Sequence, residues 1–141
     1  MFSKANLIST LVTTVWGVFG GFLFWGLIAD PYFENHQGTA TGVMKEAPDM
    51  IVVVLGSLIA GFLFSTIYSK WARGSHSLSH GAQFGVLIGL LIGFGDRLIE
   101  YGVANILDLN GTIVNGITYI MFFIIMGILA SLVYGKMKAK A

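Results

Sequence analysis

Three ionisable residues, Asp96, Arg97 and Glu100, lie close together inside an otherwise apolar stretch of the sequence. The run 85–95 before them carries no charge, and the whole segment is long enough to cross a bilayer. An ionisable side chain at membrane depth costs roughly 2.5–3.5 kcal/mol on insertion scales, so such groups usually face protein or water. We therefore expect any chemistry of this chain at this cluster.

Two interpretations of the cluster stay open. In the first, Arg97 neutralises Glu100 or Asp96, and the internal ion pair stabilises the fold. In the second, Asp96 and Glu100 line a hydrated outward vestibule, or a cation or proton site, because two carboxylates and one arginine leave a negative balance. The triplet 93–95, Gly-Phe-Gly, is a candidate break in the helix, of the kind that transporters use at binding sites.

The remaining residues offer little chemistry. His76 and His80 are four apart and would share a helical face, but no third ligand accompanies them, so we predict no metal site. His36 stands alone and is expected to be exposed to solvent. The sequence has no cysteine, nucleophile–base pair or phosphate-binding loop. We predict no cofactor and a protein that is not an enzyme.

The composition is that of a membrane protein. The 141 residues, 1–141, suffice for one domain, and 55% of them are hydrophobic while only 11% are charged. A soluble domain has about 25% charged residues, which it needs to cover its surface. A net charge of +1 provides no broad basic face, so we predict no nucleic-acid partner.

Four apolar runs each reach the ~20 residues that a transmembrane helix needs. They predict an all-α integral membrane protein, a bundle of four transmembrane helices at about 6–29, 50–69, 82–106 and 113–135. Asp49, after Pro48, is the expected N-cap of the second helix. The outer loop, 30–49, has room for a short interfacial segment or for a lid over the acidic cluster.

The basic residues indicate the orientation. Lys4, Lys70, Arg73, Lys136, Lys138 and Lys140 fall at one end of the predicted helices, whereas the opposite loops are mainly acidic. The positive-inside bias then places both termini in the cytoplasm. Trp25 and Tyr32 suit the outer membrane–water interface, and Trp71 and Tyr134 suit the inner one.

Small residues recur at a spacing of four in every predicted helix. In lipid such residues let helices approach closely, which drives their association. They form an intrachain bundle in one interpretation, and in the other the third helix's stripe joins two protomers. At 100° per residue, that stripe and both carboxylates of the cluster share an arc of roughly 80°. The predicted packing positions are Gly17, Gly21, Ser57, Gly61, Gly85, Gly89, Gly93, Gly127, Ser131 and Gly135.

Four stretches of the sequence carry a family resemblance: 38–46 (Gly-Thr-Ala-Thr-Gly-Val-Met-Lys-Glu), 70–72 (Lys-Trp-Ala), 85–93 and 108–112 (Asp-Leu-Asn-Gly-Thr). With the helix layout, they make the chain resemble a group of small four-helix membrane proteins of Bacteroidota and related bacteria, whose function is unknown. Members carry an acidic residue near Asp96 and a tyrosine near Tyr101, usually without an arginine at Arg97. The resemblance implies a bacterial inner membrane and no particular activity.

Two functions remain from the sequence. The first is a non-catalytic integral membrane protein that acts as a self-associating scaffold or accessory subunit, with the lipid bilayer, copies of itself and other membrane proteins as partners. The alternative is a small oligomeric channel or transporter in which Asp96 and Glu100 face an aqueous path for a cation or a proton.

Overall fold

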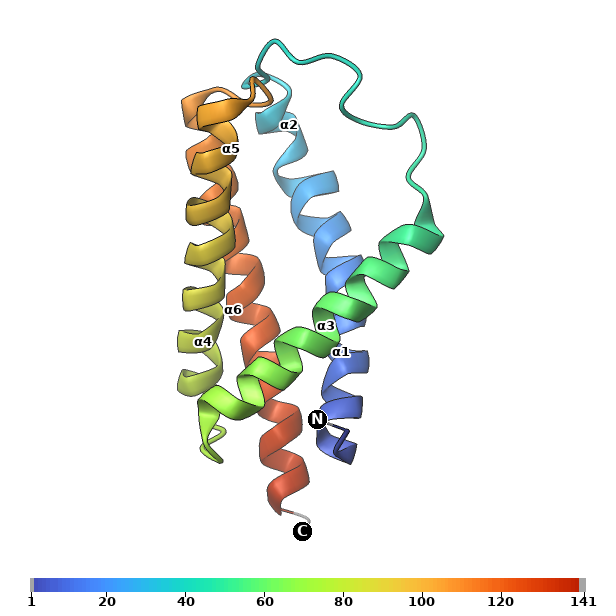
Figure 1. Cartoon of the computed structure of the whole chain (residues 1–141), viewed down its shortest axis with the longest axis vertical. Helices are drawn as coiled ribbons and strands as arrows, with labels where there is room; N and C mark the ends of the chain where they lie inside the picture. The colour runs from blue at the N-terminus through green and yellow to red at the C-terminus, as the bar shows by residue number, and fades with distance from the viewer. Residues whose placement is uncertain (1, 140–141) are drawn as a thin grey trace.

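The computed structural model describes residues 2–139, so Lys140 lies outside the described part of the chain. Within it, four helices are long and apolar enough to cross a membrane: Lys4–Ile28, Met50–Ala72, Leu78–Val103 and Leu109–Ala139. They run in alternating directions along the chain, and α3 crosses the others obliquely in Figure 1. We call the end that carries loops 34–49 and 104–108 the outer end, and the end with the turn at 73–77 the inner end.

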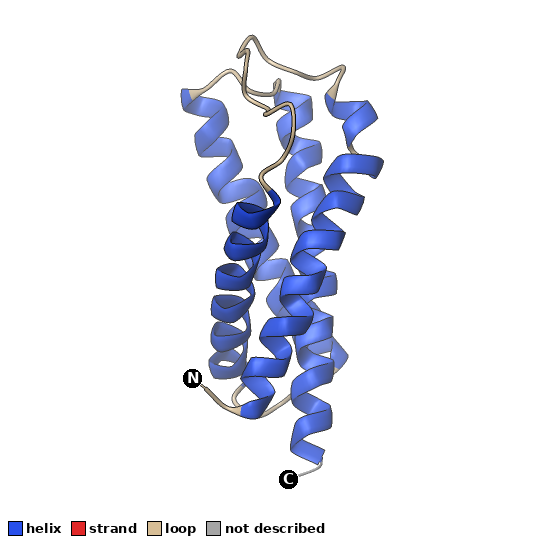
Figure 2. Cartoon of the chain, turned by 90° about the vertical axis from the view of Figure 1, so that its right-hand side faces the viewer, coloured by secondary structure: helices blue, strands red, loops and turns tan. Residues whose placement is uncertain are grey.

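Two of the four helices change their winding along their length. The first consists of α1 (Lys4–Gly21) and η1 (Phe22–Ile28), and a short helix α2 (Asp30–Phe33) follows it. The third consists of α4 (Leu78–Leu90), η2 (Leu91–Asp96) and α5 (Arg97–Val103). The second and fourth are single α-helices, α3 (Met50–Ala72) and α6 (Leu109–Ala139). Figure 2 shows the same helices from the side, with the long outer loop above them.

Capping residues explain where the helices depart from their predicted bounds. The side chain of Asp49 accepts the amide of Val52 at the start of α3, which confirms its predicted role as N-cap. Ser77 accepts the amide of His80, so the third helix begins at Leu78 and not near residue 82. It also ends before residue 106, because Ala104 is extended, with φ −141° and ψ 149°.

The fourth helix also begins earlier than the predicted residue 113, because Asp108 caps it. The backbone amide of Gly111 donates to Asp108 Oδ1 at 2.7 Å, and the amide of Thr112 donates to the Asp108 carbonyl. The inner ends are longer than predicted as well. α3 continues to Ala72, three residues beyond the predicted 69, before Arg73 turns into the left-handed region at φ 47°.

The third helix is not broken at the glycine triplet. The segment Leu91–Asp96 winds as a π-helix and continues directly into α5. A π turn bonds residue i to i+5 and thus holds one residue more than an α turn. Residues beyond η2 are therefore rotated relative to the uniform α-helix that the helical-wheel prediction assumed.

The closest packing in the molecule joins α4 and η2 to α6. A Cβ atom placed on Gly89 would lie 2.5 Å from the Cα of Ile120, and one on Gly93 would lie 2.6 Å from the Gly116 carbonyl oxygen. Gly85 meets the backbone at Phe123 and Ile124 in the same way. The glycine stripe of the third helix therefore packs against α6 of the same chain. It is not available for the contact between two protomers that the second interpretation of the small residues predicted. Two predicted positions complete this contact, since Gly127 and Ser131 both pack against Gly81.

α1 packs on α3 through other small residues. Gly17 faces Ser57, whose Cβ would lie 3.3 Å from a Cβ on the glycine, and Gly61 lies against the hydroxyls of Thr13 and Thr14. Gly21 differs from its prediction. A Cβ at Gly21, the last residue before η1, would meet no atom of residues 2–139 within 4 Å.

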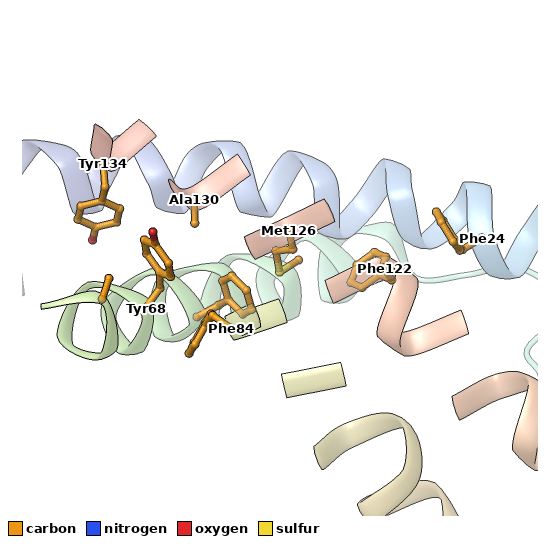
Figure 3. Packing of buried hydrophobic residues seen from close by; sticks show 9 residues of the cluster. Phe24, Tyr68, Phe84, Phe122, Met126, Ala130 and Tyr134 are labelled. Atoms are coloured by element: carbon orange, nitrogen blue, oxygen red, sulfur yellow. The ribbon is translucent and has the colours of Figure 1, made fainter. Parts of the chain in front are cut away.

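Aromatic side chains fill the space between the helices, as Figure 3 shows. Tyr134 and Trp25, predicted to lie at the membrane–water interfaces, belong to this interior. Tyr134 is only 8% exposed, and its ring lies 5.6 Å from that of Tyr68, centroid to centroid, in a tilted arrangement. The indole nitrogen of Trp25 donates to Asn115 Oδ1 at 2.8 Å, which gives its polar edge a partner within the protein.

The close α4–α6 contact makes a direct prediction. Gly89→Ala forces a methyl group against the Ile120 backbone, and overpacking of this kind lowers the free energy of unfolding by about 1–3 kcal/mol. Gly21→Ala is the matched control, because open space receives its methyl group and alanine favours helices by up to about 1 kcal/mol over glycine. Denaturant titration of the detergent-solubilised variants measures both. Equal stabilities would contradict the packing described.

Candidate functional site

The charged cluster forms a compact ion-pair group at the outer end of the third helix. The Arg97 guanidinium donates from Nη1 to Glu100 Oε2 at 2.7 Å and from Nη2 to the carboxylate of Asp96. All three side chains belong to one helix, so their ion pairs do not link separate helices. The side chains are unequally exposed, at 59% for Asp96, 33% for Glu100 and 24% for Arg97.

Arg97 is the member of the cluster that faces the neighbouring helix. Its Cζ atom lies 6.0 Å from the centroid of the Tyr119 ring on α6, within range of a cation–π interaction. Asp96 differs from the prediction that both carboxylates continue the glycine face, because Gly93 is buried whereas the Asp96 side chain is 59% exposed. The extra residue in the π turn explains this, since it moves the position one turn after Gly93 from Asp96 toward Arg97.

Little space surrounds the cluster. A cavity of about 10 Å³ lies between Arg97, Glu100 and the α6 residues Thr112 and Asn115. That volume accommodates roughly one water molecule. The Nε atom of Arg97 is buried and has no hydrogen-bond partner within the described part of the chain. The cavity beside Arg97 and Glu100 therefore has room for a single small guest such as a water molecule.

The outer loops close over this end of the bundle through a clamp that we define as His36, Gln37, Gly38, Leu107 and Asp108. The ring of His36 bonds to Asp108 Oδ2 at 2.8 Å and stacks on Tyr32 with the ring centroids 4.2 Å apart. His36 is thus neither isolated nor fully exposed, contrary to its prediction. Gly38 donates its amide to the Ile106 carbonyl at 2.8 Å, and an isolated β-bridge pairs Gln37 with Leu107.

The inner histidines have separate partners. His80 Nδ1 lies 2.8 Å from the hydroxyl of Ser77, whereas His76 Nδ1 lies 3.4 Å from the Tyr68 hydroxyl. Burial, with Lys138 and His80 as further causes, lowers the pKa of His76. Among residues 2–139, no group of three or more histidine and acidic side chains is placed to hold a metal ion.

Sequence reasoning missed a buried polar seam between α1, α3 and α6. Asn6 is 2% exposed and donates from Nδ2 to both Thr66 Oγ1 and Tyr134 Oη, each at 3.1 Å. Tyr134 in turn donates to the Ser65 carbonyl, and the hydroxyls of Ser9 and Ser65 lie 2.8 Å apart. The signal in the sequence was the polar face of the first helix, where Asn6, Ser9, Thr10, Thr13 and Thr14 recur at helical spacing.

An apolar hollow lies between α3 and the third helix. We call it the lateral groove, and it has a volume of about 580 Å³. α6 forms its floor, with Phe123 and Met126. Its two walls include Val53, Gly56 and Ala60 on α3 and Ile88, Leu91 and Ile92 on α4 and η2. The charged cluster is not part of its lining.

No protein-family model, no curated protein and no solved structure matches this chain. Function is therefore inferred from the geometry of the chain itself.

The ion-pair group predicts how charge removal affects stability. Arg97→Gln leaves two neighbouring carboxylates without a cation, so we expect a lower free energy of unfolding than in the wild type. The triple variant Arg97→Gln, Asp96→Asn, Glu100→Gln removes the repulsion and should regain most of the loss. Denaturant titration compares them. A triple variant no more stable than Arg97→Gln would contradict this role.

The outer clamp predicts an acid-sensitive contact. The Gly111 amide, and then the His36 ring, hold the pKa of Asp108 below its ordinary value of 3.8. A depressed carboxyl pKa stabilises the folded state above pH 3.8 and loses that contribution as the pH falls through the folded-state pKa. The melting temperature of Asp108→Asn should therefore fall less between pH 5 and pH 3 than that of the wild type. An unchanged pH dependence would contradict the prediction.

Proposed function

We propose that this protein is a multi-pass protein of the bacterial inner membrane, with both termini in the cytoplasm, that acts as a non-catalytic self-associating scaffold or accessory subunit. Its bundle is a rigid support, and its function is to bring membrane proteins, including copies of itself, together. The observation that carries the proposal is that residues 50–56, the outer end of the apolar helix α3, are all exposed.

The distribution of charge supports the membrane placement. Lys4, Lys70, Arg73, Lys136 and Lys138 gather where α1 begins, α3 turns into α4 and α6 ends, which is one end of the bundle (Figure 1). Asp30, Glu34, Glu46, Asp49 and Asp108 belong to the opposite end. The positive-inside bias assigns the basic end to the cytoplasm. The resemblance to the Bacteroidota group supports the inner membrane.

The polar groups of the interior are bonded to one another, which supports a scaffold rather than an ion channel. Arg97 contacts both carboxylates of the cluster, and the adjoining cavity of about 10 Å³ is too small for a hydrated ion path. The polar seam is likewise occupied by its own hydrogen bonds, from Asn6 to Tyr134 and from Ser9 to Ser65. By contrast, the apolar residues 50–56 of α3 are exposed.

The exposed segment of α3 is apolar. Each of residues 50–56 is exposed, and no charged residue occurs between Asp49 and Lys70. Its mean hydropathy of 2.4 is the highest of the four membrane-length helices. Transmembrane helices associate by close packing, so a helix edge with no packing partner of its own is suited to one from another subunit.

Native mass spectrometry of the protein, gently extracted from its host membrane, tests the scaffold. We expect either a closed assembly of two or more copies or a defined complex with other membrane subunits. Cation flux into proteoliposomes provides the second readout, for the wild type and for Asp96→Asn with Glu100→Gln. A monomer without partners would contradict the scaffold. Flux that the double variant abolishes, with its fold intact, would instead establish the permeation alternative.

A further inference from the structure

The turn at residues 73–77, between α3 and α4, is anchored to the helices by a single inward side chain. Residues 73, 74, 75 and 77 are exposed, whereas His76 is half-buried. The backbone bends sharply just before it, because Arg73 and Gly74 both have positive φ values, of 47° and 83°. His76 is therefore the residue through which this turn contacts the interior.

Two tyrosines on different helices form the site that receives His76. The His76 ring stacks on Tyr134 of α6 with the centroids 5.2 Å apart, and its Nδ1 atom lies 3.4 Å from the hydroxyl of Tyr68 on α3. The centroids of the two tyrosine rings lie 5.6 Å apart, as Figure 3 shows from close by. Both tyrosines are buried, so His76 connects an exposed turn to the interior of the bundle.

The polar seam begins directly behind this site. The Tyr134 hydroxyl accepts from Asn6 Nδ2 and donates to the Ser65 carbonyl, each at 3.1 Å. These bonds join α6 to α1 and α3 within the membrane-length helices. Since His76 stacks on the same tyrosine from the side of the turn, the turn covers the inner end of the seam.

The surroundings of His76 offer no negative charge. All seven acidic residues of the sequence lie in the outer loops or at the outer ends of helices. Lys138 is bonded to the turn itself, because its Nζ donates to the Gly74 carbonyl at 2.8 Å. A protonated His76 would therefore meet cations and no carboxylate partner. The other charged and titratable groups at the inner end are Lys4, Tyr68, Lys70, Arg73, His80, Tyr134 and Lys136.

The site between the tyrosines accordingly disfavours the charged ring. Burial first, and then the charges of Lys138 and His80, hold the pKa of His76 below its ordinary value of 6.5. A depressed histidine pKa means that the closed turn binds the proton more weakly than an open one. The contact of His76 thus stabilises the closed turn above pH 6.5, and this contribution is lost as the pH falls from 6.5 through the closed-state pKa.

We propose that the turn at residues 73–77 is an acid-sensitive lid over the inner end of the polar seam, which opens when His76 takes up a proton. The neutral ring lies between Tyr68 and Tyr134, whereas the imidazolium leaves this site for water. Opening exposes the Tyr134 hydroxyl, and with it the seam, to solvent. On the cytoplasmic placement proposed above, the lid responds to acidification of the cytoplasm, which adds regulation that a scaffold alone does not require.

Hydrogen–deuterium exchange of the full chain in nanodiscs tests the lid. His76→Phe retains an aromatic ring for the stacking on Tyr134 but takes up no proton. The exchange rate of amides 73–75 in the wild type, divided by that in His76→Phe, cancels the intrinsic effect of pH on exchange. We expect this ratio to rise about threefold or more between pH 8 and pH 5. A ratio that stays constant overturns the inference.

His80→Gln is the matched control, because it removes the neighbouring histidine of the same turn. The amide of residue 80 still donates to Ser77, so the start of α4 keeps its cap. Amides 73–75 should therefore retain their acid response in this variant. A response that disappears with His80 and persists in His76→Phe assigns the proton to the wrong histidine and overturns the lid.

An imidazole NMR titration of the wild type provides a second readout, which does not depend on a substituted histidine. The His76 ring should titrate below pH 6.5, and Lys138→Gln should raise its pKa because a neighbouring cation is removed. A His76 ring that titrates above pH 6.5 would contradict the proposal. Both readouts report on a single chain, so they are independent of the proposed self-association.

Discussion

The rest of the structure depends on the backbone contact between the third and fourth long helices. In a bilayer, helices gain little by burying apolar surface against each other, so they must gain from close van der Waals packing. Gly85, Gly89 and Gly93 permit this, because side chains at these positions would collide with the backbone of α6. The contact runs along α6 from Gly127 to Gly116.

The first and second helices are held by different chemistry. Hydrogen bonds from Asn6, Ser9 and Thr13 connect α1 to α3, and the indoles of Trp16 and Trp25 bond to α6. These bonds fasten α3 to α1 mainly at its inner half. Nearer the outer end, α3 is joined to α1 at Ser57, which accepts from the Thr14 hydroxyl and packs on Gly17, and residues 50–56 beyond it are exposed.

The charged cluster takes its arrangement from the winding of its helix. The π turn at Leu91–Asp96 brings Arg97 over Tyr119 and leaves Asp96 toward the outside. The arginine then neutralises both carboxylates within its own helix, at little cost in space. An ionisable group within a membrane helix is by default a candidate functional site. Ionisable groups there also pair with one another, as Arg97 does with both carboxylates of the cluster.

The sequence by itself determined the class of the protein, because apolar length and charge balance are local properties that any fold must respect. Four helices of membrane length, the Asp49 cap and the pairing of Arg97 with its neighbours all follow from residues close together in the chain. The tertiary structure decided which surfaces meet. Whether Gly89 and Gly56 face a helix of the same chain depends on helix crossings, which small residues permit equally at both positions. No periodic pattern in the sequence specifies the π turn in the third helix. Nor does one specify the contacts between residues far apart in the chain, such as His36 with Asp108 and Asn6 with Tyr134. These features are determined only when segments distant in the sequence pack against each other.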